Sequence, residues 1–221
     1  MNHDVAEGLA RTHARIAQAC TRAGRDPSEV TLVAVSKTHR SEALRAAYAA
    51  GQRVFGESYA QELARKAAAL ADLDIEWRMI GHLQRNKVKR VVGAGAAIDS
   101  VDSRRLATAI ATQASAQGRA VPICIQVNIA AEPQKSGVAP EELDALVAHA
   151  RSLPSLDLRG LMTVPPARKD PRPYFRALAE LARRHGLPEL SMGMSGDLEV
   201  AVEEGATMVR VGTAIFGPRG T

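Results

Sequence analysis

A lysine at the end of a buried strand is the residue of this sequence best suited to covalent chemistry. The apolar and β-branched run at 31–35 predicts a strand buried on both faces, as in a parallel sheet, and Lys37 follows it after Ser36. Two interpretations are open. Lys37 either extends its ammonium group into water at the rim of the fold, or its amine is partly desolvated and nucleophilic, as a Schiff-base lysine must be.

Residues suited to binding an anion follow the last two strand-like runs of the chain. Ser195 and Gly196 follow one run, and Gly212 and Thr213 end the other. Glycine lets the backbone approach an anion, and the two hydroxyl groups can donate hydrogen bonds to it. The structural alternatives are a plain helix cap for Ser195 and a tight turn for Gly212.

Arg210 precedes Gly212 by two residues, so strand alternation places both on one face of the pleat. An arginine that points into a closed sheet is costly unless a partner or a ligand meets it. The alternative is an outward-facing Arg210 that pairs with Glu203 or Glu204. An inward Arg210 would complete a set of three chemical groups at one end of the fold.

These three groups together suit a phosphorylated aldehyde. Pyridoxal 5'-phosphate offers an aldehyde to Lys37, a ring nitrogen to Arg210, and a phosphate to the residues that follow the last two strands, which are Ser195, Gly212 and Thr213. A phosphosugar aldolase would also use a lysine and a phosphate site, and it is the alternative that the residues leave open.

The elements that must position these residues alternate regularly between strands and helices. Strands are predicted at 31–36, 54–58, 77–81, 96–101, 122–128, 158–163, 190–194 and 208–212, and helices at 4–23, 41–50, 59–70, 86–92, 104–117, 140–151, 174–185 and 197–204. Eight such repeats predict a single-domain (β/α)8 TIM barrel over residues 1–221 with an extra N-terminal helix. An open doubly wound sheet is the competing architecture, but residues 36–39 offer no glycine-rich fingerprint.

Composition narrows the class of protein further. The 29 Lys and Arg residues against 24 Asp and Glu residues give a net charge of +5, but they are scattered, which favours a solvated surface over a nucleic-acid site. Cys20 and Cys124 lack CxxC spacing, so we expect two buried thiols in a reducing compartment. The six histidines are dispersed, so no metal site is expected. No signal peptide or long apolar run is visible, so a soluble, cytoplasmic protein away from membranes is expected.

Motifs spread over nearly the whole chain resemble the pyridoxal phosphate homeostasis protein family. They are VAVSKTH (33–39), FGESYAQE (55–62), IGHLQRNK (80–87), QVNIAAEPQKSGV (126–138), GLMTVPP (160–166) and LSMGMSGDLEVAVEEGATMVRVGTAIFG (190–217). The resemblance implies a barrel of the alanine racemase N-terminal type (fold type III). It also implies pyridoxal phosphate held as a Schiff base on Lys37, with its phosphate at Ser195, Gly212 and Thr213 and its pyridine nitrogen facing Arg210.

Three positions depart from the family pattern. Ser58 stands where the family usually has the asparagine of FGENY, Arg85 where it has the serine of HLQSNK, and Gly196 where it has an aspartate after MS. Ser58 puts in doubt any contact that an asparagine would make there. Gly196 puts in doubt the rigidity of the turn on the phosphate side.

The resemblance and the chemistry of Arg210 both favour a non-catalytic protein. The family is described as cofactor-carrying and regulatory, without an established turnover. A guanidinium that donates to the pyridine nitrogen leaves that nitrogen unprotonated, so the ring becomes a weak electron sink. Racemases of this fold take a second base from a further domain and a partner chain, which we expect this chain to lack. A racemase-like enzyme and a basic RNA-binding barrel are the alternatives.

Further residues are expected near the mouth of the site. Ser58 and Asn128 end predicted strands, His82 follows one, and Lys135 lies in the polar loop after the fifth strand. Lys135 is a candidate second amine or a solvated loop lysine, and His82 is a candidate for proton transfer or a structural residue. We expect a monomer, with enzymes that depend on pyridoxal phosphate as its partners.

Overall fold

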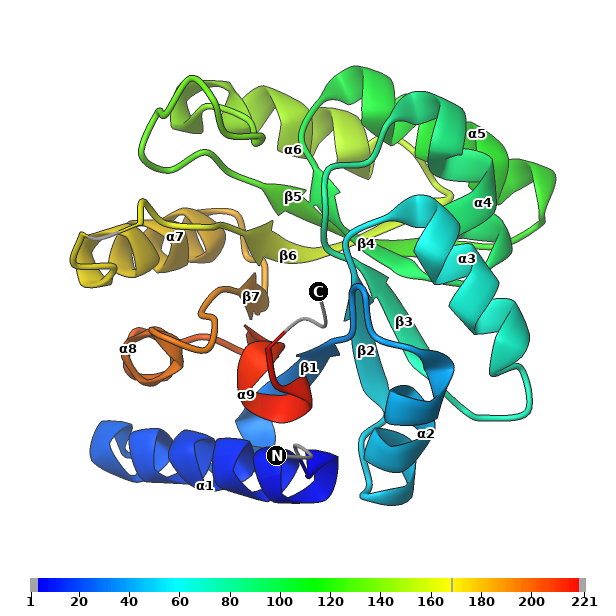
Figure 1. The fold of residues 1–221 in the computed structure, drawn as a ribbon. Coiled ribbons are helices and arrows are strands. Elements are labelled where there is room, and N and C mark those ends of the chain that lie inside the picture. Colours follow the sequence, from blue (N-terminus) through cyan, green and yellow to red (C-terminus); the bar gives the residue numbers. More distant parts are fainter. Residues whose placement is uncertain (1–3, 168, 219–221) are drawn as a thin grey trace.

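Eight parallel strands close into a barrel in the computed structural model, which describes residues 4–167 and 169–218 (Figure 1). The strands pair in chain order, and the last pairs with the first. They are β1 (Thr31–Val35), β2 (Val54–Glu57), β3 (Glu76–Met79), β4 (Ala97–Val101), β5 (Val121–Gln126), β6 (Leu156–Met162), β7 (Glu189–Ser191) and β8 (Met208–Val211). The predicted (β/α)8 architecture is confirmed.

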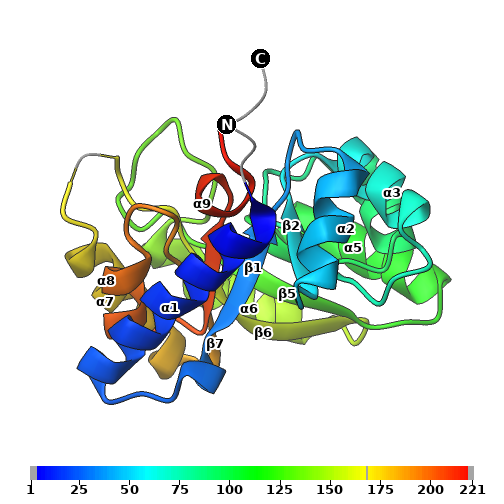
Figure 2. The same cartoon turned by 60° about the horizontal axis from the view of Figure 1, so that its bottom comes forward.

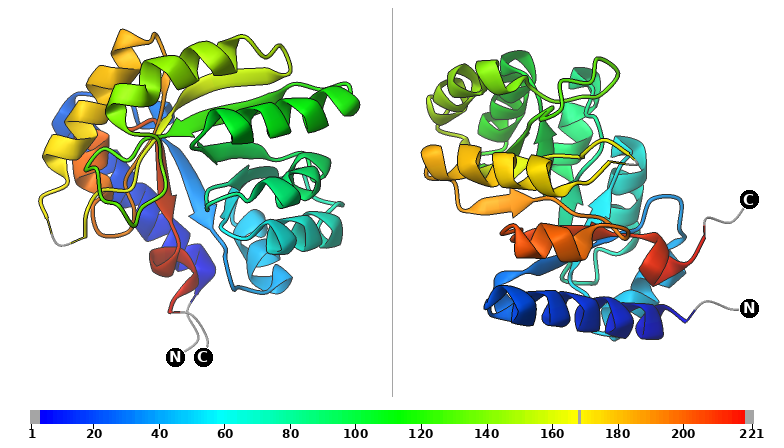
Figure 3. Two further views of the ribbon diagram at one scale, coloured as in Figure 1. Left: turned by 90° about the horizontal axis from the view of Figure 1, so that it is seen from above. Right: turned by 90° about the vertical axis from the view of Figure 1, so that its left-hand side faces the viewer.

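Helices surround the barrel and cover its outer face (Figures 1 and 3). They are α1 (Val5–Ala23), α2 (Ser41–Ala49), α3 (Ala60–Ala69), α4 (Val88–Gly93), α5 (Arg104–Ala116), α6 (Leu143–Arg151), α7 (Arg172–Arg184), α8 (Leu198–Glu203) and α9 (Thr213–Phe216), with short 3-10 turns η1 (Pro27–Glu29), η2 (Arg85–Lys87) and η3 (Pro140–Glu142). The extra helix α1 lies along α8, and its first turns lie beside α9 (Figure 2). It therefore supports the segments that follow β7 and β8.

The interior of the barrel differs from the layer between barrel and helices. The outer layer is a continuous core of Leu, Ile, Val, Ala and Phe. Inside the barrel, a small apolar group (Val33, Cys124, Met162 and Met208) shares the space with charged side chains. Strand alternation explains the division, because successive residues of each strand face opposite sides of the sheet.

The seventh strand is shorter than the sequence predicts. It ends at Ser191, not at Met194, because Gly193 adopts a left-handed backbone conformation with φ of 91°. Glycine is required there, because a Cβ atom would lie 2.5 Å from Cβ of Ala201. Hydrogen bonds to β8 continue as far as the carbonyl of Gly193, which accepts from the N–H of Arg210 at 2.9 Å, and the turn that carries Ser195 follows.

Other differences lie at the ends of elements. The predicted fifth strand stops at Gln126, beyond which Val127 makes an isolated bridge with Val138. The predicted helices at 86–92 and 140–151 each open with a 3-10 turn, and the short helix α9 was not predicted. Among the described residues, no helix is long and apolar enough to cross a membrane.

Candidate functional site

A cavity of about 430 Å³ opens at the carboxyl ends of the strands, where chemistry gathers in (β/α)8 barrels. Its lining combines apolar residues with most of the predicted site residues. The apolar ones are Val35, Ile80, Val164 and Met194, and the others are Lys37, Ser58, Ser195, Gly196, Arg210, Gly212 and Thr213. Residues up to 178 positions apart in the chain, Val35 and Thr213, therefore meet in one place.

Lys37 reaches this cavity because of the alternation that begins in β1. Val33 faces the barrel interior, where its Cγ1 lies 2.9 Å from the position that a Cβ of Gly56 would take. Val35 and Lys37 continue on the same face and line the cavity. Ser36 points the other way, and its hydroxyl donates to Oε1 of Glu57 at 2.6 Å. The half-buried Lys37 thus ends the inner face of β1.

Arg210 points inward from β8 and is 5% exposed. Its guanidinium donates to Oγ of Ser191 at 2.8 Å and to the carbonyl of Thr163 at 2.8 Å. The alternative of an outward Arg210 paired with Glu203 or Glu204 is wrong, because those carboxylates bind arginines of the outer helices. Burial lowers the pKa of Arg210, but a guanidinium stays charged at any physiological pH.

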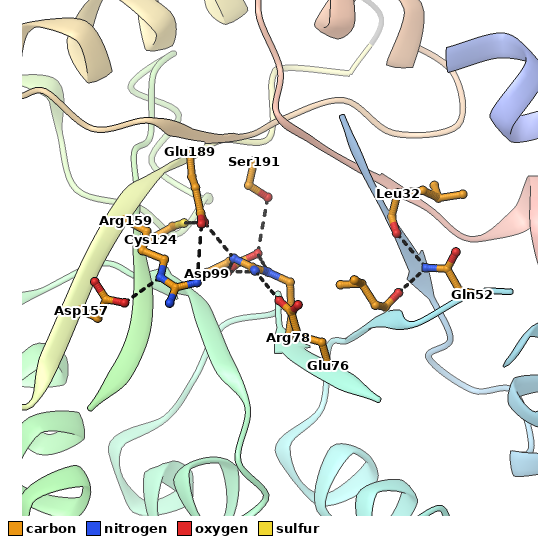
Figure 4. A network of polar contacts seen from close by, with 11 residues as sticks. Leu32, Gln52, Glu76, Arg78, Asp99, Cys124, Asp157, Arg159, Glu189 and Ser191 are labelled. Atoms are coloured by element: carbon orange, nitrogen blue, oxygen red, sulfur yellow. Dashed lines mark hydrogen bonds and ion pairs between the residues drawn. The ribbon is translucent and has the colours of Figure 1, made fainter. Parts of the chain in front are cut away.

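A layer of charged residues lies inside the barrel beside Ser191 (Figure 4). The hydroxyl of Ser191 connects this layer to Arg210. Arg78 and Asp99 form an ion pair of 2.7 Å, and both side chains are almost fully buried. Burial works against the charge of Arg78, but Asp99 outweighs it and raises the arginine pKa. Ser191 lies 3.5 Å from Asp99 through its hydroxyl. The side chain that holds Arg210 is therefore itself anchored in an ion pair.

The hydroxyl residues of the cavity come from the turns after β7 and β8. Ser195 is not the cap of α8, because that helix begins at Leu198 and Asp197 precedes it. Thr213 begins α9, whose first internal hydrogen bonds are donated by Ile215 and Phe216 to the carbonyl of Gly212. The N–H groups at the start of a helix are not used within it. The turns therefore supply hydroxyl and backbone donors together.

Gly212 and Gly196 occupy different surroundings. A Cβ atom on Gly212 would lie 3.1 Å from the carbonyl oxygen of Val35, so the backbone of β8 passes close to β1 at this point. A Cβ atom on Gly196 would meet nothing within 4 Å. Steric space thus restricts the residue type at position 212, whereas position 196 is open.

A helix outside the barrel holds the Ser195 turn. Arg15 of α1 donates to the carbonyl of Ser195 at 2.9 Å and pairs with Glu199 at 2.6 and 2.9 Å. The N–H of Met194 donates to the carboxylate of Asp197 at 2.6 Å. Sequence analysis did not find the role of Arg15, because nothing local links it to a residue 180 positions away.

Asn128 and Lys135 belong to the loop after β5. The amide of Asn128 donates to the carbonyl of Glu132 at 2.8 Å and accepts from its N–H at 3.1 Å, so it closes the loop. The ammonium of Lys135 pairs with the Glu132 carboxylate at 2.6 Å and donates to the carbonyl of Pro165 at 2.8 Å. Lys135 lines a second cavity of about 460 Å³, which shares Val164, Met194 and Gly196 with the first.

His82 lies in a hollow on the other side of Ser58. Its Nδ1 atom is 3.3 Å from the carboxylate of Asp102 and 3.3 Å from the hydroxyl of Ser136. Ser58 lines both this hollow and the main cavity. The structure thus brings six of the predicted site residues into one cavity and places Asn128, Lys135 and His82 around it.

A buried ion cluster behind Lys37 was missed by sequence analysis. Lys66 of α3 lies 2.6 Å from the carboxylate of Glu57 and 2.9 Å from that of Glu62. The i to i+4 spacing of Glu62 and Lys66 signals a helix pair, and the nearly full burial of Lys66 could not be read from it. Arg78 and Asp99 carried a better signal, because Arg78 stands between Trp77 and Met79 and Asp99 directly follows Ile98 in strand-like runs.

Comparison with known proteins places the barrel in a family. The model of the alanine racemase N-terminal domain matches residues 9–220. The proteins named pyridoxal phosphate homeostasis protein from Pseudomonas aeruginosa and Aquifex aeolicus are each 46% identical to this chain. The alignments cover 97% of this chain and 96% of the former, and 96% of this chain and 97% of the latter.

A solved structure matches over almost the same length. It is PipY of Synechococcus elongatus with pyridoxal phosphate bound, which is 40% identical and superposes with a TM-score of 0.83. The superposition covers 96% of this chain and the whole of PipY. The likeness therefore extends over the barrel, its outer helices and the end of the barrel that carries the cavity.

Proposed function

Because the chain belongs to the family of alanine racemase N-terminal domains, we propose that it binds pyridoxal 5'-phosphate in the cavity around Lys37 and acts in the homeostasis of this cofactor. The observation that carries the proposal is the meeting of an amine, two hydroxyl groups and a buried guanidinium in one cavity. The names of the relatives and the pyridoxal phosphate in PipY support it.

The residues present fit the chemical groups of this cofactor. The cavity volume lies in the range of small-molecule sites. Lys37 would hold the aldehyde carbon, Ser195 and Thr213 would donate to the phosphate, and Arg210 would face the ring nitrogen. Gly212 has no side chain, so its backbone could approach the phosphate closely, and a Cβ atom there would lie 3.1 Å from the carbonyl oxygen of Val35. The bound cofactor supplies an aldehyde that can be exchanged between amines.

Arg210 sets the chemistry that this site favours. Its two hydrogen bonds, to Ser191 and to the carbonyl of Thr163, fix the guanidinium in place. A fixed cation beside the ring nitrogen keeps that nitrogen from taking up a proton, which weakens the ring as an electron sink. We therefore propose a carrier without catalytic turnover that works as a cytoplasmic monomer and delivers the cofactor to apoenzymes. The racemase-like alternative is not favoured, because the full-length relatives are named as homeostasis proteins.

The test is a spectral titration of the apoprotein with pyridoxal phosphate. We expect the visible absorbance band of a Schiff base, its loss in Lys37→Ala, and its retention in Lys89→Ala, which changes an exposed lysine of α4. Borohydride reduction followed by peptide mapping should place the label on Lys37. Label on Lys135 alone would overturn the assignment of the lysine, and robust Lys37-dependent racemisation of amino acids would overturn the carrier function.

A further inference from the structure

Helix α3 holds the backbone on both sides of Lys37. The carbonyl of Ser36 accepts a hydrogen bond from the ammonium of Lys66 at 2.6 Å, and the N–H of Thr38 donates to Oε1 of Glu62 at 2.8 Å. These two groups belong to the peptide units before and after the α-carbon of Lys37. The direction in which the Lys37 side chain leaves the chain is therefore determined by two side chains of α3.

The two holding side chains belong to one buried ion cluster, made of Lys66, Glu57, Glu62 and Ser36. Lys66 is 2% exposed and Glu57 is fully buried. Oε1 of Glu57 accepts from both Lys66 and the hydroxyl of Ser36, each at 2.6 Å. Its other oxygen, Oε2, accepts no hydrogen bond from any residue that the structure describes. The free-energy cost of burying these charges is large. Packing alone does not account for the cluster, which points to a role for its hydrogen bonds in holding the backbone in place.

The backbone at Thr38 shows what the cluster holds in place. Thr38 has a φ of 68°, in the left-handed region that β-branched residues avoid. A residue in this region persists only where its surroundings hold it there. The hydrogen bond from its N–H to Glu62 is such a restraint. The same Oε1 atom of Glu62 meets Lys66 at 2.9 Å, which keeps the carboxylate in position.

We propose that Lys66 and Glu62 are positioning residues that aim the amine of Lys37 into the cavity by holding the Ser36 carbonyl and the Thr38 N–H. This inference rests on the proposed function for its biological meaning, but the aim of Lys37 is a property of the apoprotein. Lys66 and Glu62 lie outside the barrel wall and act through the backbone of Lys37.

The test measures the reactivity of the Lys37 amine in the apoprotein, without the cofactor. Apoprotein is treated with trace acetic anhydride, and acetylation of Lys37 is compared with that of the exposed Lys89 by mass spectrometry. The rate of Schiff-base formation with pyridoxal phosphate is measured in parallel. We expect Lys66→Met and Glu62→Ala to change the relative labelling of Lys37 and to slow Schiff-base formation by about tenfold or more, because small misplacements of a reacting group are costly.

Conservative and destabilising variants separate positioning from a loss of stability. Glu62→Gln keeps an acceptor oxygen for Thr38 and should restore most of the rate lost in Glu62→Ala. Thr38→Gly in the Glu62→Ala background should also restore it in part, since glycine adopts a positive φ without strain. Leu63→Ala removes a fully buried side chain of the same helix and should leave the reactivity of Lys37 unchanged in the folded protein.

Two outcomes would overturn the inference. One is labelling and Schiff-base rates in folded Lys66→Met and Glu62→Ala that stay within about twofold of the original protein. The other is a loss of Lys37 labelling and Schiff-base rate in Leu63→Ala equal to that in the two variants. Such a loss would show that the stability of the fold alone governs the reactivity of Lys37. If the unaltered protein forms no Schiff base with pyridoxal phosphate, the proposed function fails, and the acetylation arm still decides whether α3 positions Lys37.

Discussion

The two sides of the cavity are supported by ion pairs that differ in burial. On the lysine side, Lys66 holds the carbonyl before Lys37 and pairs with Glu57, and the side chains of this pair are 2% and 0% exposed. On the hydroxyl side, the turn of Ser195 is held by Arg15 and Glu199, whose side chains are 33% and 31% exposed. Both pairs include a residue of an outer helix, but only the first is sealed from water.

The difference in burial implies a difference in rigidity. A buried charge that loses its partner is strongly destabilising, whereas exposed pairs contribute little and are screened by salt. The lysine side is therefore expected to stay fixed, and the hydroxyl side can adjust at small cost. The proposed covalent anchor at Lys37 would then be fixed and the proposed anion contact adjustable, which suits the proposed binding and release of a cofactor.

The largest expected effect is that of Lys66→Ala on the lysine side. It leaves two carboxylates beside each other without their cation, so we expect the free energy of unfolding to fall by about 3–5 kcal/mol. Urea denaturation at equilibrium measures the change. The double variant Lys66→Met with Glu57→Gln removes both charges and should recover most of the loss. A fall below about 1 kcal/mol in Lys66→Ala would contradict the contrast between the two sides.

The next effect is expected from Gly8→Ala in α1. A Cβ atom there would lie 2.7 Å from the carbonyl oxygens of both Ala214 and Ile215, so α1 and α9 must separate. Overpacking of this kind costs about 1–3 kcal/mol, and the displaced Thr213 should weaken cofactor binding in the spectral titration. The matched control is Gly93→Ala in α4, where a Cβ atom meets nothing within 4 Å. Equal stability of the two variants would show that α1 does not press on α9.

A smaller effect is expected from Arg15→Ala on the hydroxyl side. The pair with Glu199 is half-exposed, so its loss should cost roughly 1 kcal/mol or less. The bond to the Ser195 carbonyl is lost with it, so cofactor release should become faster while Schiff-base formation keeps its rate. Stopped-flow measurements of both steps test this. A slower Schiff-base formation in Arg15→Ala would show that the two sides are coupled.

The smallest effect is the response of the partly exposed Arg–Glu pairs of the outer helices to acid. Hydrogen bonds from arginines lower the pKa of Glu199, Glu203 and Glu204 below the usual 4.5. Carboxylates with a lowered pKa in the folded protein stabilise it above their unfolded pKa, and this stabilisation is lost as the pH falls through the folded pKa. Melting temperatures should therefore fall as the pH is lowered below 4.5, and less so in high salt.

Glu57 should act in the opposite direction. Burial raises its pKa, with Lys66 opposing the shift. Its contribution to stability is therefore present in acid and is lost as the pH rises through the raised folded pKa. Glu57→Gln should make the acid loss of stability steeper than in the unaltered protein. An unchanged pH profile would show that Lys66 fully compensates the burial of Glu57.

Local patterns predicted most of the fold. The strand-like runs between the helices identified all eight strands, because most of their residues are buried and apolar. Errors fell where a single residue decides the backbone path, as at Gly193, which ends the seventh strand early. The sequence also suggested an inward Arg210, but it left open an outward pair with Glu203 or Glu204. Only the contacts of Arg210, Glu203 and Glu204 in the folded chain distinguish the inward from the outward arrangement.

The sequence by itself determined the alternation of strands and helices and the chemical types that follow the strands, since both depend on residues close together in the chain. Only the tertiary structure decided that Lys37, Ser195 and Arg210 share a cavity with Ser58. It decided as well that Lys135 pairs with Glu132 and lines the second cavity. It also decided that Lys66 lies behind Lys37 and that Arg15 reaches a carbonyl 180 residues away. Such contacts depend on how the barrel closes, and closure is a property of all eight strands together.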